Sequence, residues 1–197
     1  MQPVLLYLPY LPSVGWFKDY LSGAEVFIEA EENFVKSSKR NRAEIVGGNG
    51  RLLLSIPVAG GRDHHQKYRD TQTHGTDWQK SHWQSLRSAY GSSPFFEHYG
   101  PVLEPLFNGA ETNLFAFNLR MLNTLLRLLK SSQQYALTTA YTKQPEGVLD
   151  YRSKAGSYTF KRYYQVFEDR HGFQADLSVV DLLFNLGPQS LNYLKDI

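Results

Sequence analysis

The sequence predicts an α/β fold in which a small mixed sheet, with an N-terminal parallel β-α-β unit, is covered by several packed helices. The first observation is a strand-length apolar run from Val4 to Leu8, followed by a helix signal at Ser13 and a second strand. The second is a set of amphipathic segments of helical length further along the chain. The third is size, because 197 residues with 42% hydrophobic and 14% aromatic side chains can bury a core as one domain over residues 1–197.

The N-terminal β-α-β unit is predicted from the residues that mark where its strands and its helix begin and end. The run Val4–Leu8 ends in the proline-rich turn Pro9–Pro12, and Ser13 is a good N-cap for a helix over residues 13–22. Gly23 is placed to end this helix as a left-handed C-cap, before a second strand from Ala24 to Glu29. Two strands joined through a helix pair in parallel with a right-handed crossover, so this third of the chain is predicted to be α/β.

The middle of the chain adds a strand and a helix. Residues 47–50 resemble a hairpin turn, and a strand from Arg51 to Val58 follows them. Thr76 and Gln79 have the spacing of a capping box, which predicts a helix over residues 77–90.

The C-terminal half is predicted to be mainly helical. One long amphipathic helix spans residues 112–130, a clean helix begins at Ser178 and runs to residue 186, and a last helix starts at Pro188. Tyr135–Tyr141 and Tyr163–Phe167 are predicted to be short extended pieces.

Charge and composition exclude several classes of partner. Lys and Arg number 21 against 19 Asp and Glu, so a net charge of +2 indicates neither nucleic-acid nor membrane-surface binding. No apolar run reaches the roughly 20 residues of a membrane helix, and prolines interrupt the apolar start that would resemble a signal peptide. With no Cys to form disulfides, we expect a soluble cytoplasmic domain.

The loops after the first two strands are the candidate binding region. Ligands of open α/β sheets lie beyond the carboxyl ends of the strands, which here are the turn Pro9–Ser13 and the segment from Ala30. That segment carries Lys36, Arg40 and Arg42, and guanidinium groups match phosphate or carboxylate. A nucleotide sugar or another anionic small molecule is the natural partner. The alternative is a solvated basic turn neutralised by neighbouring glutamates.

The sequence gives weaker signals for catalytic or metal-binding residues than for the candidate binding region. His82 could act as a general acid or base, although a helix histidine among aromatic residues is more often structural. Residues 59–76 form a polar stretch that could be a lid or a binding loop. Its Asp63, His64, His65 and His74 match no metal-ligand spacing, so no metal site is predicted, and the sequence identifies no cofactor.

Several ordered segments resemble the WbqC-like family. They are Tyr7–Phe17, Glu32-Asn33-Phe34 through Arg40-Asn41-Arg42, Leu54-Ser55-Ile56-Pro57-Val58, His82-Trp83, Tyr90, Ser93-Pro94-Phe95-Phe96 and Asp176–Asn185. This chain departs from the family pattern at Lys39, an extra cation where aromatic or small residues are usual.

The resemblance implies a place in bacterial surface-polysaccharide and amino-sugar biosynthesis, without a settled reaction. We expect either an enzyme that transfers an acyl or aminoacyl group to an activated sugar, or a non-catalytic binding or assembly protein. The predicted catalytic residue is His82, and the predicted binding residues are Tyr10, Glu32, Lys36, Arg40, Asn41, Arg42 and Tyr90. Asn41 and Arg42 are predicted to face a pocket shared with the Pro9–Ser13 turn and the helix of His82.

Overall fold

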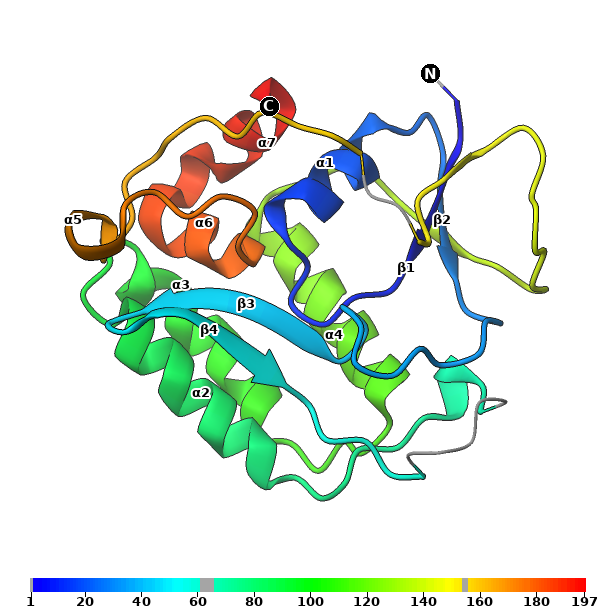
Figure 1. Cartoon of the computed structure of the whole chain (residues 1–197), viewed down its shortest axis with the longest axis horizontal. Coiled ribbons are helices and arrows are strands. Elements are labelled where there is room, and N and C mark those ends of the chain that lie inside the picture. The colour runs from blue at the N-terminus through cyan, green and yellow to red at the C-terminus, as the bar shows by residue number, and fades with distance from the viewer. Residues whose placement is uncertain (1, 61–65, 154–155) are drawn as a thin grey trace.

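A four-stranded parallel sheet forms one half of the fold. The computed structural model describes residues 2–60, 66–153 and 156–197. The strands β1 (Val4–Tyr7), β2 (Val26–Glu29), β5 (Ala136–Leu137) and β6 (Leu149–Asp150) lie in the order β5-β2-β1-β6 (Figure 1). Every neighbouring pair is parallel, and Val4 of β1 is in register with Val26 of β2. The predicted α/β fold class and its β1-α1-β2 unit are therefore confirmed.

Helix α1 (Val14–Ser22) joins β1 to β2. Its N-cap is confirmed, since the Ser13 side chain accepts a hydrogen bond from the Trp16 amide at 3.3 Å. The prediction that Gly23 is a left-handed C-cap is wrong, because this residue is extended with a φ of −80°. A Cβ atom at Gly23 would lie 2.6 Å from a methyl carbon of Val4, so glycine is needed here for close packing.

An antiparallel hairpin lies beside the parallel sheet. It consists of β3 (Arg42–Gly47) and β4 (Gly50–Ser55). The turn and the second strand were predicted, although β4 ends at Ser55 and not at Val58, and β3 was not predicted as a strand. Gly50 has a φ of +99°, which explains why a glycine occupies this turn position.

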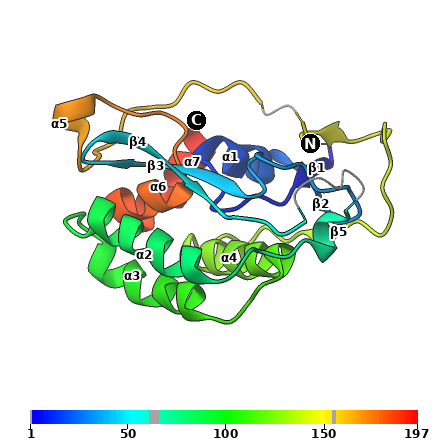
Figure 2. The same ribbon diagram turned by 60° about the horizontal axis from the view of Figure 1, so that its bottom comes forward.

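Helices cover the sheet and the hairpin. Helices α2 (Asp77–Tyr90), α3 (Phe96–Leu103) and α4 (Leu114–Leu128) form one layer, with α6 (Val179–Leu186) and α7 (Ser190–Asp196) beside α1 (Figure 2). A short helix α5 (Glu168–His171) lies near the hairpin turn. Aromatic side chains fill the space between the layers. Within the described ranges, no helix combines the length and hydropathy that crossing a bilayer requires.

Several connections differ from the prediction. Of the predicted strand over residues 135–141, only Ala136 and Leu137 pair with β2, and residues 163–167 form no strand. The two-residue strand β6 was not predicted. Thr76 does not cap α2 with its side chain, so the predicted capping box does not form.

The polar stretch 59–76 has an anchor that the sequence analysis overlooked. The side chain of Tyr68 is fully buried, and its hydroxyl donates a hydrogen bond to the Leu8 carbonyl oxygen at 2.8 Å. Asn33 also forms a β-bridge with Lys67. The described part of this stretch is thus tied to the end of β1 and to the segment after β2.

Candidate functional site

A cavity of about 710 Å³ opens at the carboxyl ends of the parallel strands. Tyr7 ends β1 and Asp150 ends β6, while Arg42 begins the hairpin, so three separate parts of the chain form its walls. Figures 1 and 2 show the hairpin and the segment that precedes β6 on opposite sides of the end of β1. The charged lining consists of five cations, Lys39, Arg40, Arg42, Lys143 and Arg152, and three carboxylates, Glu32, Glu44 and Asp150.

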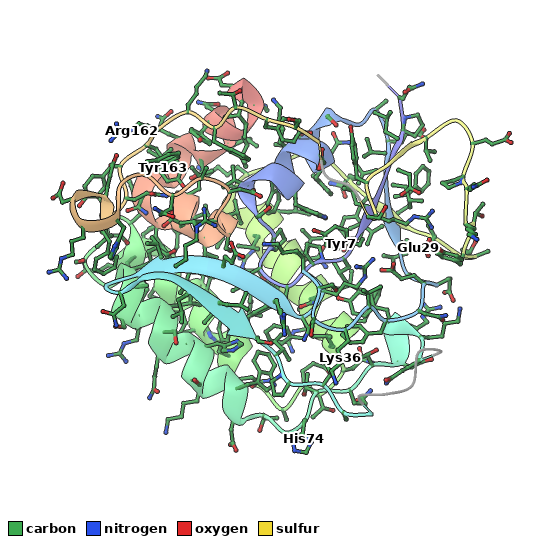
Figure 3. The ribbon with its side chains drawn as sticks, viewed as in Figure 1. Tyr7, Glu29, Lys36, His74, Arg162 and Tyr163 are labelled. Carbon is green, nitrogen blue, oxygen red and sulfur yellow. The ribbon has the colours of Figure 1, made fainter. Side chains whose placement is uncertain are left out.

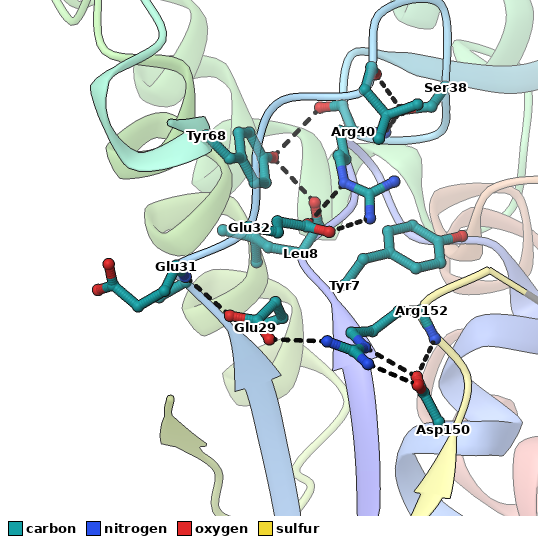
Figure 4. Close-up of polar contacts among 12 residues, drawn as sticks. Tyr7, Leu8, Glu29, Glu31, Glu32, Ser38, Arg40, Tyr68, Asp150 and Arg152 are labelled. Carbon is teal, nitrogen blue, oxygen red and sulfur yellow. Dashed lines mark hydrogen bonds and ion pairs between the residues drawn. The ribbon is translucent and has the colours of Figure 1, made fainter. Parts of the chain in front are cut away.

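A buried ion pair lies in the wall of the cavity next to Tyr7. Nε and Nη2 of Arg40 donate to the two carboxylate oxygens of Glu32 at 2.6 and 2.5 Å, in a bidentate arrangement (Figure 4). The guanidinium carbon of Arg40 lies 4.8 Å from the ring centroid of Tyr7. Burial raises the pKa of Glu32, and the hydrogen bonds from Arg40 oppose that shift. Arg40 is therefore neutralised by Glu32 and held in one orientation.

A second ion-pair network joins the ends of β2 and β6. Arg152 donates to Glu29 Oε2 at 3.1 Å and to both carboxylate oxygens of Asp150, at 2.9 and 2.7 Å (Figure 4). The other oxygen of Glu29 accepts from the Thr138 hydroxyl at 2.7 Å. The hydrogen bond from Arg152 lowers the pKa of Asp150. Three of the four strands, β2, β5 and β6, thus end at residues that this network connects.

Two cations of the lining are not neutralised in this way. Glu44 is shared by Lys39, at 3.7 Å, and Arg51, at 2.7 Å. Among the described residues, neither Arg42 nor Lys143 forms an ion pair with a carboxylate. Nε of Arg42 is buried and has no hydrogen-bond partner within the same residues. Because no carboxylate of the described residues offsets the charge of Arg42 or Lys143, an anion in the cavity would be favoured beside them.

Tyr7 contributes a neutral donor to the same cavity. Burial raises the pKa of its hydroxyl to about 12, although Arg40 opposes the shift. The hydroxyl therefore stays protonated near neutral pH, where it can donate a hydrogen bond to a bound oxygen atom.

The other predicted site residues lie in the core. The hydroxyl of Tyr10 and Nδ1 of His82 share a buried hydrogen bond of 2.9 Å, and burial lowers the pKa of His82 to about 4. The side-chain amide of Asn41 donates to the Ile56 carbonyl oxygen at 3.0 Å, and Tyr90 is fully buried. The cavity that Arg42 lines does not include Tyr10, Asn41 or His82 in its wall, so the shared pocket was predicted wrongly.

The structure therefore places only some of the predicted site residues at the cavity. Glu32, Arg40 and Arg42 line one cavity, whereas Tyr10, Asn41, His82 and Tyr90 are packed inside the protein. Lys36 lies on the exposed segment between β2 and β3 and does not line the cavity (Figure 3).

The histidine-containing stretch shows no metal centre within the described residues. Asp63, His64 and His65 lie outside them. His74 is distant from Tyr7 and Glu29 in Figure 3. No group of three His, Cys, Asp or Glu side chains suited to a metal occurs in residues 2–60, 66–153 and 156–197.

Sequence reasoning missed most of the cavity lining. Tyr7 lies next to the end of the predicted strand Val4–Leu8, and the rule that ligands lie at such ends could have identified it. Tyr141 ends the predicted extended piece 135–141, so the same rule could have identified it. Lys143 and Arg152 had no such signal, because β6 is too short to be recognised from a hydrophobic pattern.

Comparison with known proteins identifies the family. The family model described as "WbqC-like protein family" matches residues 8–162, which include most of the cavity lining. This chain belongs to the WbqC-like family. A relative of this chain is the "Uncharacterized protein Rv1507c" of Mycobacterium tuberculosis, which is 29% identical over 218 aligned positions that cover 94% of each chain. No solved structure matches this WbqC-like chain.

Proposed function

We propose that the cavity binds the phosphate groups of a nucleotide sugar and that the protein acts in the cytoplasm on an activated amino sugar during surface-polysaccharide biosynthesis. The observation that carries this proposal is the excess of positive charge in the cavity. Three of the five cations face carboxylates, which leaves Arg42 and Lys143 to attract an anion of about two charges. The association of WbqC-like proteins with amino-sugar gene clusters supports the choice of an activated sugar.

Different roles follow for the basic residues. Arg42, which lines the cavity and forms no ion pair among the described residues, is the principal phosphate ligand, and Lys39 and Lys143 add charge. The charge of Arg40 is offset by Glu32, so we assign this pair to positioning Tyr7 and the start of β3. Lys36 is placed to attract the ligand from the exposed segment beside the cavity.

The buried polar residues are proposed to fix the backbone segments that form the cavity wall. Asn41 precedes Arg42, and its amide fixes the backbone to Ile56, which sets the direction in which the arginine leaves the strand. Tyr10 and His82 link the turn after β1 to helix α2. A transfer of an acyl or aminoacyl group would need the sugar amine to be deprotonated, but His82 is buried away from the cavity wall, so we assign it to positioning the turn after β1 and not to that proton transfer. Tyr90 is proposed to support the same side of the site.

A thermal-shift screen of nucleotide sugars tests the proposal. A ligand present at 100 times its dissociation constant should stabilise the folded state by about 2.7 kcal/mol, which raises the Tm. Arg42→Ala should keep its fold and lose roughly 1.5 to 3 kcal/mol of binding free energy, the range for a hydrogen bond to a charged group. The matched control is Arg127→Ala, since Arg127 is exposed on α4 and does not line the cavity.

The alternative, a binding or assembly protein without catalytic activity, predicts a different result. In that case, no nucleotide sugar would raise the Tm, whereas a purified protein partner would. Equal ligand-induced shifts for the wild type and Arg42→Ala would also contradict the proposal, because the charge at Arg42 would then have no part in binding.

A further inference from the structure

Tyr141 is an aromatic residue that the fold itself leaves half uncovered. It is 50% exposed and lines the cavity, whereas most of the large aromatic side chains are buried or partly buried. One face of its ring is covered by Arg152, whose guanidinium carbon lies 5.0 Å from the ring centroid. Half of this residue stays exposed at the cavity while Arg152 covers one face of its ring.

The support beneath the ring is rigid. Arg152 is 9% exposed and donates hydrogen bonds to Glu29, to Asp150 and to the Lys143 carbonyl oxygen at 3.3 Å. A guanidinium held by this number of partners has little freedom to move. Its plane positions the Tyr141 ring at the cavity before any ligand binds, so stacking on that ring requires little ordering of the side chain.

The uncovered ring lies next to cations of the cavity. Lys143 follows Tyr141 by two residues in the same segment, and it is one of the two lining cations that form no ion pair with a carboxylate of the described residues. A nucleotide presents a planar base and a phosphate group within one small molecule. Every base has a π-face, so an aromatic platform beside a cationic cavity is the arrangement that nucleotides favour.

Resting on the proposed function, we infer that Tyr141 is a binding residue on which the base of the nucleotide stacks, with Arg152 holding the opposite face of the ring. The inference separates two halves of the ligand. Arg42 recognises phosphate, and Tyr141 recognises the base.

Calorimetric titration with UDP, ADP and inorganic pyrophosphate tests this division. Tyr141→Leu should weaken the binding of at least one nucleoside diphosphate by about 5-fold to 150-fold, the range for loss of one base stack. The same variant should bind pyrophosphate as the wild type does. Tyr141→Phe retains the ring and should stay within about 2-fold of the wild type, since aromatic stacking does not need the hydroxyl.

Two further variants serve as controls. Tyr164 is 57% exposed and does not line the cavity, so Tyr164→Leu should leave all three affinities unchanged. Arg42→Ala should weaken nucleoside diphosphates and pyrophosphate by similar factors. Thermal unfolding of each variant shows that the fold persists.

The outcomes distinguish this inference from the proposed function. If Arg42→Ala weakens every ligand while Tyr141→Leu changes none, phosphate binding stands and base stacking on Tyr141 is refuted. If Tyr141→Leu weakens pyrophosphate as much as UDP and ADP, the residue acts only by supporting Arg152, and the inference is again wrong. If the wild type binds none of the three ligands, both proposals fail.

Discussion

Asp181 in helix α6 should make the stability of this protein depend on pH. The carboxylate is fully buried, and one of its oxygens accepts hydrogen bonds from the Tyr163 hydroxyl at 2.6 Å and from the Gln165 amide at 2.9 Å. Burial raises the pKa of Asp181 from 3.8 to about 6, although these hydrogen bonds oppose the shift. The folded state therefore holds this proton more tightly than the unfolded state does.

The sign and size of the effect follow from this shift. Below about pH 4 both states are protonated, and the favourable contribution is fully present. Between pH 4 and 6 the unfolded chain loses the proton first, so the free energy of unfolding decreases as the pH rises. A shift of about two pKa units corresponds to a loss of about 3 kcal/mol, complete above pH 6.

Asp181→Asn isolates this contribution, because the amide oxygen can still accept hydrogen bonds but cannot ionise. Urea unfolding of both proteins from pH 4 to 7.5 gives the free energy of unfolding of the variant minus that of the wild type. This difference should grow by about 3 kcal/mol between pH 4 and 6.5 and then level off. A difference that stays constant across this range would refute the reasoning, whatever its absolute value.

Three further predictions concern the candidate site and its surroundings. Glu32→Gln leaves the guanidinium of Arg40 buried without its counter-charge, so urea unfolding should show a loss of about 3 to 5 kcal/mol; a loss below 1 kcal/mol would mean that the pair is well solvated. Gly23→Ala introduces a methyl group against β1 and should cost about 1 to 3 kcal/mol, measured as a lower Tm; an unchanged Tm would show that β1 can shift without cost. The ring of His82 should titrate by NMR with a pKa near 4, and its depressed value means that stability is lost as the pH falls from about 6.5 toward 4; titration near 6.5 would contradict its burial.

The sequence predicted those elements whose own residues determine them. Helix α2 begins and ends at the predicted residues, Asp77 and Tyr90, because its apolar positions recur at helical spacing. Strand β6 could not be predicted, since two residues that include Asp150 carry no pattern. It becomes a strand only because β1 offers a free edge.

The sequence likewise predicted only part of the candidate site. The proximity of Arg40 and Arg42 to a strand end was correctly inferred from their positions in the chain. Which cation would be neutralised was not predictable. Glu32 and Arg40 are eight residues apart, and their pairing depends on how the segment after β2 folds back. The position of Arg152 depends on a contact with Glu29 across 123 residues of sequence.

The short ladder of β6 has a consequence for how a ligand could leave. Only Leu149 and Asp150 pair with β1, and both are exposed, so this edge belongs to the low-stability end of the molecule. The wall that carries Tyr141 and Lys143 is then held mainly by the ion pairs of Arg152 with Glu29 and Asp150, and it can detach in a sub-global opening that breaks these pairs while the helices stay packed. Ligand release would be limited by that local opening and not by global unfolding, and hydrogen exchange of the amides near Leu149 should slow when the cavity is occupied.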